Sequence, residues 1–237
     1  MIPIVSLSDL INGLIAAVIA AKVFNSYKKT SDQTIFDFFL FYVFITFFWL
    51  ALATPQIFIT DPFKMVIAST AAYIFLFMAL AIMTRISFLF ISWRTAGRMA
   101  TIIIFIGTIA FVIGRLSSLA PHQPEYFPPF IYWRPVMAPW LRILTGIMTT
   151  GSALISSSIF FYFGYKDRSN AQIFHRSILL GSGLLILLVG AVMAFLVNPN
   201  AGFAANCLAS LASIPGMVVM LYGINYKSKA TASQVIS

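Results

Sequence analysis

Residues 35–83 read IFDFFLFYVFITFFWLALATPQIFITDPFKMVIASTAAYIFLFMALAIM, an apolar stretch interrupted near its middle by Thr60-Asp61-Pro62. About 20 apolar residues in a helix cross a hydrocarbon core roughly 30 Å thick, and this stretch is about twice that length. Because proline cannot continue a helix, Pro62 is predicted to separate two spans, at 35–59 and 63–83. Backbone amides in lipid must pair internally, and the apolar runs lack the alternation of a membrane β-barrel, so both spans are predicted to be helices.

The rest of the chain has the same apolar character. Of its 237 residues, 60% are hydrophobic and 9% are charged, and the mean hydropathy is +0.95, whereas a soluble domain carries about 25% charged residues. Five further apolar runs lie at 5–24, 100–119, 136–165, 178–197 and 202–226. The sequence therefore predicts an all-α, polytopic membrane protein, with one domain of seven transmembrane helices over residues 1–230 and a short polar tail at 231–237.

The distribution of lysine and arginine predicts the orientation of these helices, because short cytoplasmic loops are enriched in both residues. With the N-terminus outside, eleven basic residues fall on the cytoplasmic side and four on the outer side. The eleven are Lys22, Lys28, Lys29, Arg85, Arg94, Arg98, Lys166, Arg168, Arg176, Lys227 and Lys229, and the four are Lys64, Arg115, Arg134 and Arg142. We therefore expect a cytoplasmic C-terminus, in a prokaryotic-type inner or plasma membrane. The net charge of +9 follows from this topology, and the inner loops are too short for a nucleic-acid-binding module.

Two predicted helices carry a face of small and polar residues at spacings of three and four, which places these residues on one side of the helix. On the first helix the face includes Asp9 and Asn12, and on the fifth it includes Arg142, Thr145 and Thr149. Small and hydroxyl residues also let membrane helices pack closely, so packing alone is the alternative interpretation. The ionisable residues are more informative, because charges within a bilayer are costly and usually face the bundle interior.

Asp9, Arg142 and Arg115 of the fourth predicted helix are expected at one depth, one to two turns inside the outer boundary, at a rise of about 1.5 Å per residue. We hypothesise that they converge as the charged end of a pocket that Asn12, Thr145 and Thr149 also line. Two positive charges against one negative charge would favour an anionic or carbonyl-bearing ligand. The alternatives are a buried structural cluster, or arginines that extend separately to the headgroups.

The outer loop at 117–139 combines six prolines with five aromatic residues. This composition predicts extended, stiff backbone at the level of the headgroups. We expect Tyr126, Tyr132 and Trp133 to fold over the pocket as a lid. The alternative is an aromatic belt at the membrane interface.

Pro215 lies inside the last predicted helix. Its missing amide leaves a carbonyl one turn earlier without a partner and is expected to kink the helix. We hypothesise that this kink is a hinge, and the alternative is an ordinary proline kink of a membrane helix.

Two features on the predicted cytoplasmic side are interpreted as structural. Thr34 and Asp37 have the spacing of a capping box at the start of the second helix, where a carboxylate complements the helix dipole. The segment 85–98 contains three arginines and several aromatic residues, and it is interpreted as a positive-inside loop, with a short interfacial segment as the alternative.

Motifs for catalysis and cofactors are missing from the sequence. His122 and His175 are expected on opposite sides of the membrane, so they cannot share a haem or a metal ion. The chain has no His-Glu-x-x-His, no Cys-x-x-Cys and no glycine-rich phosphate loop. No lysine lies between residues 202 and 226 to carry retinal. We therefore expect no enzyme activity, no cofactor and no metal site.

The first three predicted helices resemble the seven-helix N-terminal sensor region of some bacterial sensor kinases. The resemblance rests on an outside start, a first helix that ends in Lys22 and Asn25-Ser-Tyr-Lys-Lys29, and an aromatic second helix with Phe47-Phe-Trp49-Leu-Ala-Leu. It covers roughly a third of the chain, and no kinase module follows the seventh helix. The resemblance implies a stand-alone receptor that binds a small polar, anionic or lipid-derived ligand from outside and signals through a membrane or cytoplasmic protein partner.

Two other functions remain open. Sugar transporters built as three helices, a linker helix and three helices have the same orientation, and their internal repeats can be invisible in sequence. The short loops and 24 phenylalanines would also suit a non-catalytic subunit of a larger membrane complex.

Overall fold

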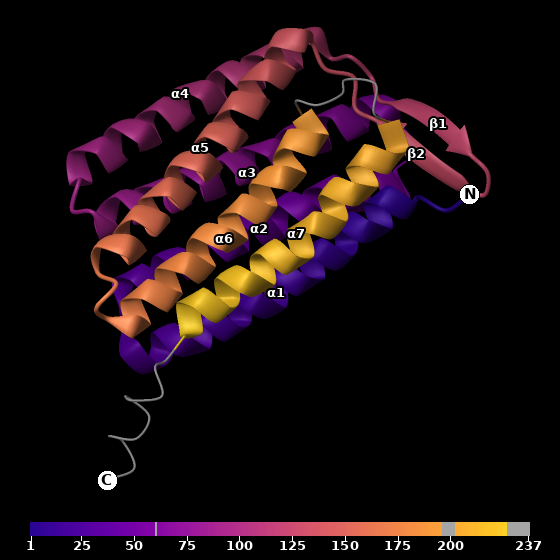
Figure 1. Ribbon diagram of the computed structural model, residues 1–237. Helices are drawn as coiled ribbons and strands as arrows, with labels where there is room; N and C mark the ends of the chain where they lie inside the picture. The colour runs from indigo at the N-terminus through magenta and orange to yellow at the C-terminus, as the bar shows by residue number, and fades with distance from the viewer. Residues whose placement is uncertain (60, 196–201, 227–237) are drawn as a thin grey trace.

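The computed structural model of the chain describes residues 1–59, 61–195 and 202–226. The helices are α1 (Ile4–Thr30), α2 (Gln33–Phe58), α3 (Pro62–Phe90), α4 (Arg94–Ser118), α5 (Pro139–Lys166), α6 (Ala171–Phe195) and α7 (Gly202–Asn225), and the strands are β1 (Gln123–Phe127) and β2 (Phe130–Arg134) (Figure 1). Seven helices of the described chain are long and apolar enough to cross a membrane. This confirms the prediction of an all-α, multi-pass membrane protein. The predicted tail at 231–237 lies outside the described residues.

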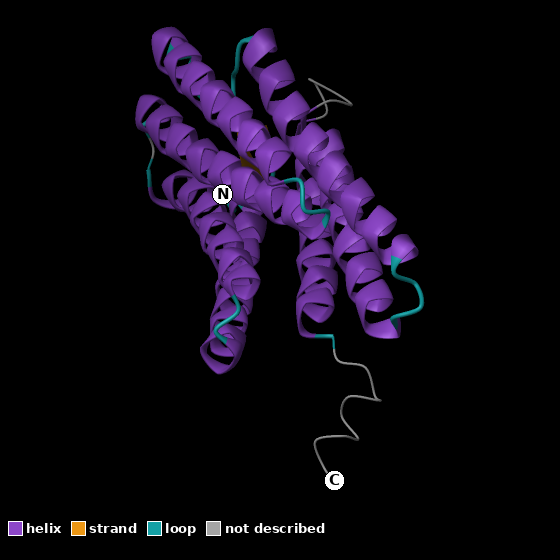
Figure 2. Ribbon diagram, turned by 90° about the vertical axis from the view of Figure 1, so that its left-hand side faces the viewer, coloured by secondary structure: helices purple, strands orange, loops and turns teal. Residues whose placement is uncertain are grey.

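Six of the helices form a closed ring. Going around the ring, the neighbours are α1, α2, α3, α5, α6, α7 and again α1, and α4 packs on the outside, mainly against α3 and α5. The helices run between the two ends of the bundle and are tilted against one another (Figure 2). The N-terminus lies beside the β-hairpin at one end of the bundle, and α7 ends at the opposite end (Figure 1). The two ends are called the hairpin end and the far end below.

The predicted break at Pro62 is confirmed, and a cap next to it explains how α3 begins. The carboxylate of Asp61 accepts hydrogen bonds from the backbone amides of Phe63 (2.9 Å) and Lys64 (3.3 Å), which have no partner inside the helix. Pro62 occupies the first turn, where a missing N–H costs nothing. The two spans are therefore separate helices.

The capping interpretation of Asp37 is wrong. Asp32 caps α2 instead, since its carboxylate accepts the backbone amide of Thr34 at 2.7 Å. Asp37 lies one turn further along, is buried, and binds the guanidinium of Arg85 on α3. The sequence showed a carboxylate near a helix start, but it did not show that this side chain faces a cation on the next helix.

The interpretation of 85–98 as a loop is also wrong. Helix α3 continues to Phe90 and α4 starts at Arg94, so only residues 91–93 connect them. Helix α1 likewise extends to Thr30, six residues beyond the apolar run. Basic and polar residues end an apolar run, but they are good enough helix formers to continue the backbone hydrogen bonds.

Most of the segment 117–139 is extended as predicted, and its central part, residues 123–134, is a regular hairpin. Strands β1 and β2 pair antiparallel from Gln123 opposite Arg134 to Phe127 opposite Phe130. Ile2 joins the edge of β2, because its amide donates to the carbonyl oxygen of Pro129 and its carbonyl accepts the amide of Ile131, both at 3.0 Å. The start of α1 therefore holds the hairpin in place.

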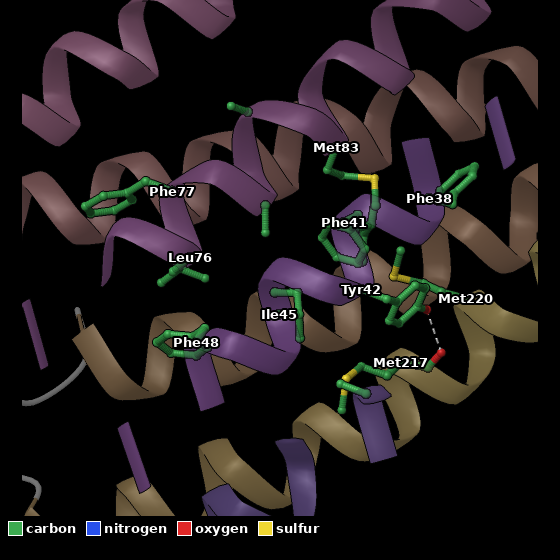
Figure 3. Packing of buried hydrophobic residues seen from close by; sticks show 14 of the residues in the cluster. Phe38, Phe41, Tyr42, Ile45, Phe48, Leu76, Phe77, Met83, Met217 and Met220 are labelled. Atoms are coloured by element: carbon green, nitrogen blue, oxygen red, sulfur yellow. Dashed lines mark hydrogen bonds between the residues drawn. The ribbon is translucent and has the colours of Figure 1, made fainter. Parts of the chain in front are cut away.

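The far half of the ring is filled by large apolar side chains from α2, α3 and α7 (Figure 3). The Tyr42 hydroxyl donates a hydrogen bond to the carbonyl oxygen of Met217 at 3.0 Å (Figure 3). Met83 and Phe41 pack beside this pair. A buried hydroxyl needs such a partner, and here it ties α2 to α7.

Candidate functional site

A cavity of about 210 Å³ lies within the ring. All six ring helices contribute to its wall, together with β2 and the residues that follow it, whereas the described wall includes no residue of α4. The cavity therefore lies on the bundle axis, where side chains from several helices meet.

The charged wall residues lie at the hairpin end, together with the apolar Val5, Pro135 and Met137, and the wall toward the far end is mostly apolar. Asp9, Arg142 and Asn206 come from the first two turns of α1, α5 and α7, and Tyr132 and Arg134 come from β2. The apolar wall consists mainly of Phe41, Ile45, Phe48, Trp49, Leu52, Leu76, Leu80, Met83, Leu184, Leu187 and Met217. Thr149, Ser152 and Ser213 add hydroxyl groups at mid-depth. This is the pattern of a site for an amphipathic molecule.

Asp9 is the carboxylate of the cavity wall. Its side chain is only 3% exposed and accepts one hydrogen bond, from the Ser210 hydroxyl at 3.0 Å. No basic side chain of the described chain lies within ion-pair distance of Asp9. A buried charge usually has a partner of opposite charge. The Asp9 carboxylate has none in the described chain, so it can accept a hydrogen bond from a further donor.

Asn12 lies one turn below Asp9 but does not line the cavity. Its amide group donates to the carbonyl oxygen of Ser210 at 2.9 Å and to the Ser210 hydroxyl at 2.6 Å. The Ser210 hydroxyl also contacts the hydroxyl of Ser8 at 2.8 Å. Asn12 thus fastens α1 to α7 and holds Ser210 where it reaches Asp9. Its role here is positional, rather than that of the wall residue we expected.

Arg142 is the second charged group of the polar end. It is partly buried, lines the cavity, and makes no hydrogen bond or ion pair with a described residue. Thr149 also lines the cavity, although its hydroxyl is bonded to the carbonyl of Thr145 at 2.8 Å. Thr145 is fully buried outside the wall and bonds the carbonyl of Leu141 at 2.9 Å. Of the expected α5 residues, two reach the cavity and one does not.

Arg115 does not join Asp9 and Arg142 at the cavity, contrary to the expected geometry. It is fully buried, and its Nη1 donates to the carbonyl oxygens of Val136 and, at 3.4 Å, Ala120. Its Nε and Nη2 have no partner among the described residues. Helix α4 lies outside the ring, so Arg115, in its last turn, supports the loop ends on either side of the hairpin.

The expected lid is represented in the cavity wall by Tyr132 alone. Tyr132 is buried, and its hydroxyl accepts a hydrogen bond from the amide of Asn206 at 2.8 Å. Burial raises the pKa of the Tyr132 hydroxyl, so the group stays a neutral phenol. Tyr126 is exposed and Trp133 is half-buried, and neither is part of the wall. Alternate residues of a strand face opposite sides. Trp133 follows Tyr132 in β2, and Tyr126 is paired with Ile131, so neither of these two expected lid residues shares the side of Tyr132.

Arg134 is a wall residue that the sequence pattern did not predict. Its guanidinium forms an ion pair with Glu125 at 3.0 Å and donates to the side-chain oxygen of Gln123 at 2.6 Å. Its charge is therefore compensated within the hairpin. Glu125 lies in β1 opposite Tyr132. The ion pair between Arg134 and Glu125 could be predicted from the sequence only if the register of the hairpin were known.

A second polar group lies beside Arg115, outside the cavity. His122 is 2% exposed, and its Nε2 lies 3.3 Å from the hydroxyl of Ser69. Burial, helped by the positive charge of Arg115, lowers the pKa of His122 to about 4. His122 is therefore neutral at physiological pH.

Pro215 lies inside α7, between the wall residues Ser213 and Met217.

In the described parts of the chain, no three His, Cys, Asp or Glu side chains come together as a metal site would need. The cavity thus offers two charged groups without an ion-pair partner in the described chain, Asp9 and Arg142, and several hydrogen-bonding groups above an apolar wall. No known protein family, curated protein or solved structure matches the chain.

Proposed function

We propose that the protein is a membrane receptor that binds a small amphipathic molecule in the ring cavity and signals through a protein partner. The observation that carries this proposal is the pair Asp9 and Arg142. Both line one cavity at the hairpin end, and neither has an ion-pair partner in the described chain. Charges within a bilayer are costly without compensation, and a bound ligand would supply it.

The size of the cavity limits the ligand. A cavity of about 150 Å³ is large enough for benzene, and this one measures about 210 Å³. We infer a ligand of about ten non-hydrogen atoms, with its polar groups at the hairpin end and its apolar part among Phe48, Trp49 and Leu76. A complete lipid would not fit.

The ligand is proposed to enter from outside the cell. The basic residues predict that the hairpin end is the outer side of a prokaryotic-type inner or plasma membrane. The polar end of the cavity lies at that end, beneath β2. The signal would leave through α7, because Ser210 and Ser213 reach the cavity and the same helix continues past Pro215 to the far end. A partner would bind at that end.

Thermal unfolding of the detergent-purified protein tests ligand binding. The probes are L-phenylalanine, 3-phenylpropionate, 2-phenylethylamine and 3-phenylpropan-1-ol, which share one apolar body. At least one is expected to raise the melting temperature of the wild type. Ala153→Phe, on the cavity wall, should abolish the shift, and the matched variant Leu154→Phe, on the exposed side of α5, should keep it. Equal shifts in both variants would place any binding outside the cavity.

Transport is a second candidate, favoured by the order of the ring. The groups α1–α2–α3 and α5–α6–α7 each occupy consecutive positions, meet at α3 with α5 and at α7 with α1, and leave α4 outside as a linker. Exchanging the two groups leaves this order unchanged, as expected for two halves related by an axis along the membrane normal. Asp9-x-x-Asn12-Gly13 and Arg142-x-x-Thr145-Gly146 then occupy equivalent places in α1 and α5.

Proteoliposomes distinguish a transporter from a receptor. A transporter should accumulate tritiated L-phenylalanine or 3-phenylpropionate in the lumen, and Ala153→Phe should stop the uptake. A receptor should bind its ligand without time-dependent uptake.

A further inference from the structure

The charges of the cavity do not pair with one another. Arg134 is compensated by Glu125. Asp9 has a hydroxyl partner but no cation, and Arg142 has no partner in the described chain. Because these two groups do not form an ion pair although both line one cavity, a gap separates the carboxylate from the guanidinium. The cavity therefore presents one negative and one positive group that are both open to a ligand.

The ring order explains why Asp9 and Arg142 remain apart. In the sequence of neighbours α1, α2, α3, α5, α6 and α7, helix α5 lies three places from α1 in either direction. The two side chains thus approach the cavity from opposite sides. Both belong to the first two turns of their helices, so they lie at the same end of the cavity.

The apolar wall lies on one side of this pair. From the level of Asp9 toward the far end, the wall continues with Phe48, Trp49, Leu76 and Leu80. A ligand that fits this arrangement carries both charges at one end and its apolar body at the other. A molecule with charges at its two ends would place one of them against the apolar residues, where charge is costly.

We propose that the cavity is specific for a zwitterion of the α-amino-acid type with an apolar side chain, its ammonium group on Asp9 and its carboxylate on Arg142. This inference rests on the proposed function, because it requires that the cavity binds a ligand. It replaces the anionic preference expected when Arg115 was counted at the site. Removal of either charge from the ligand leaves one protein charge buried and uncompensated, which costs at least tenfold in affinity.

Calorimetric titration of the purified full chain at pH 7 tests this specificity. L-phenylalanine and L-leucine are compared with the analogues that lack the ammonium group (3-phenylpropionate, 4-methylpentanoate) and the carboxylate (2-phenylethylamine, 3-methylbutylamine). At least one amino acid is expected to bind, with both of its singly charged analogues at least tenfold weaker. Asp9→Asn should weaken the amino acid at least tenfold and leave the deaminated acid unchanged. Arg142→Gln should weaken the binding of the amino acid at least tenfold as well, and it should leave the affinity for the decarboxylated amine unchanged.

The ratio of the affinities for an amino acid and for its singly charged analogue is compared within one variant. A fold defect would weaken both compounds, whereas a loss of specificity changes their ratio. Asp9→Asn keeps an acceptor for Ser210, and Lys64→Gln, at an exposed position of the hairpin end, is a charge-matched control for Arg142→Gln. If an analogue binds as tightly as its amino acid and Ala153→Phe excludes it, the zwitterion inference is overturned and the proposed function stands. Unchanged amino-acid binding in both charge variants overturns it likewise. If none of these compounds, nor 3-phenylpropan-1-ol, binds the wild type, both proposals fail.

Discussion

Asp37 on α2 and Arg85 on α3 form an ion pair, with Oδ1 of the carboxylate 2.6 Å from Nη2 of the guanidinium. The two side chains differ in environment, since that of Asp37 is 3% exposed and that of Arg85 is 46% exposed. Arg85 thus reaches from the surface to compensate a buried carboxylate and joins two consecutive helices near the far end.

Arg85→Gln should destabilise the protein by about 2 kcal/mol, because it leaves the buried Asp37 carboxylate without its cation. The loss is smaller than for a fully buried pair because Arg85 is half exposed and its charge is partly screened by solvent. The free energy of unfolding in mixed micelles measures the effect. The double variant Asp37→Asn/Arg85→Gln should recover part of the loss, and the exposed Arg98→Gln should change little. An Arg85→Gln protein as stable as Arg98→Gln would show that the pair contributes nothing.

Asn12→Leu should loosen the contact between α1 and α7, since it removes both hydrogen bonds to Ser210. Interhelical hydrogen bonds in membranes contribute about 1 kcal/mol each, so the expected loss is about 1–2 kcal/mol. Ser26→Ala is the control, because Ser26 bonds Asn225 across the same helix pair at an exposed position. Hydrogen exchange of the first three turns of α1 should increase in Asn12→Leu and not in Ser26→Ala. Equal exchange in the two variants would contradict the role given to Asn12.

Stability should fall as the pH falls from about 6.5 to about 4, because of His122. The pKa of His122 is lowered to about 4 by burial and by Arg115, so below pH 6.5 the unfolded chain binds a proton that the folded chain does not, and unfolding becomes easier. The full shift corresponds to about 3 kcal/mol. Melting temperatures at pH 7.5 and 4.5 measure it. His122→Asn should flatten this dependence, whereas a substitution of the exposed His175 should not; a slope unchanged by His122→Asn would disprove the assignment.

The orientation of the bundle is tested by single-cysteine labelling in intact cells. In a Cys207→Ser background, a cysteine at Gln123 should react with a membrane-impermeant maleimide from outside, whereas a cysteine at Asn170 or a tag at the C-terminus should react only after lysis. The excess of basic residues on the side of Asn170 is the physical basis. External labelling at Asn170 would invert the proposed topology and the side of ligand entry.

If Pro215 acts as a hinge, Pro215→Ala should leave ligand binding intact and abolish the conformational change that α7 transmits to its far end. An alanine restores the backbone amide that proline lacks and stiffens α7. The affinity for the ligand should stay within about threefold of wild type, because Pro215 does not line the cavity. The ligand-induced change in reactivity of a cysteine at Asn225, at the end of α7, should be lost. A full ligand-induced change in cysteine reactivity in Pro215→Ala would show that Pro215 is an ordinary proline kink and not a hinge.

The sequence was sufficient for the membrane architecture because hydrophobicity acts locally. Each apolar run is long enough to cross a bilayer by itself, so the number of helices and the break at Pro62 follow without knowledge of any neighbour. The polar faces of α1 and α5 were visible for the same reason, since the helical period alone puts Asp9 and Asn12, or Arg142 and Thr149, on one side.

Only the tertiary structure decided which of these residues meet. Helical phase and depth describe one helix at a time, and they do not say which helix is next to it. Arg115 lies in the last turn of α4, at the same end of the bundle as Asp9 and Arg142, yet it lies outside the cavity because α4 packs outside the ring. Asp37 has the sequence spacing of a capping box with Thr34, yet it pairs with Arg85 because α2 and α3 pack side by side. The position of a helix around the bundle depends on packing between side chains distant in sequence, and no local pattern encodes it.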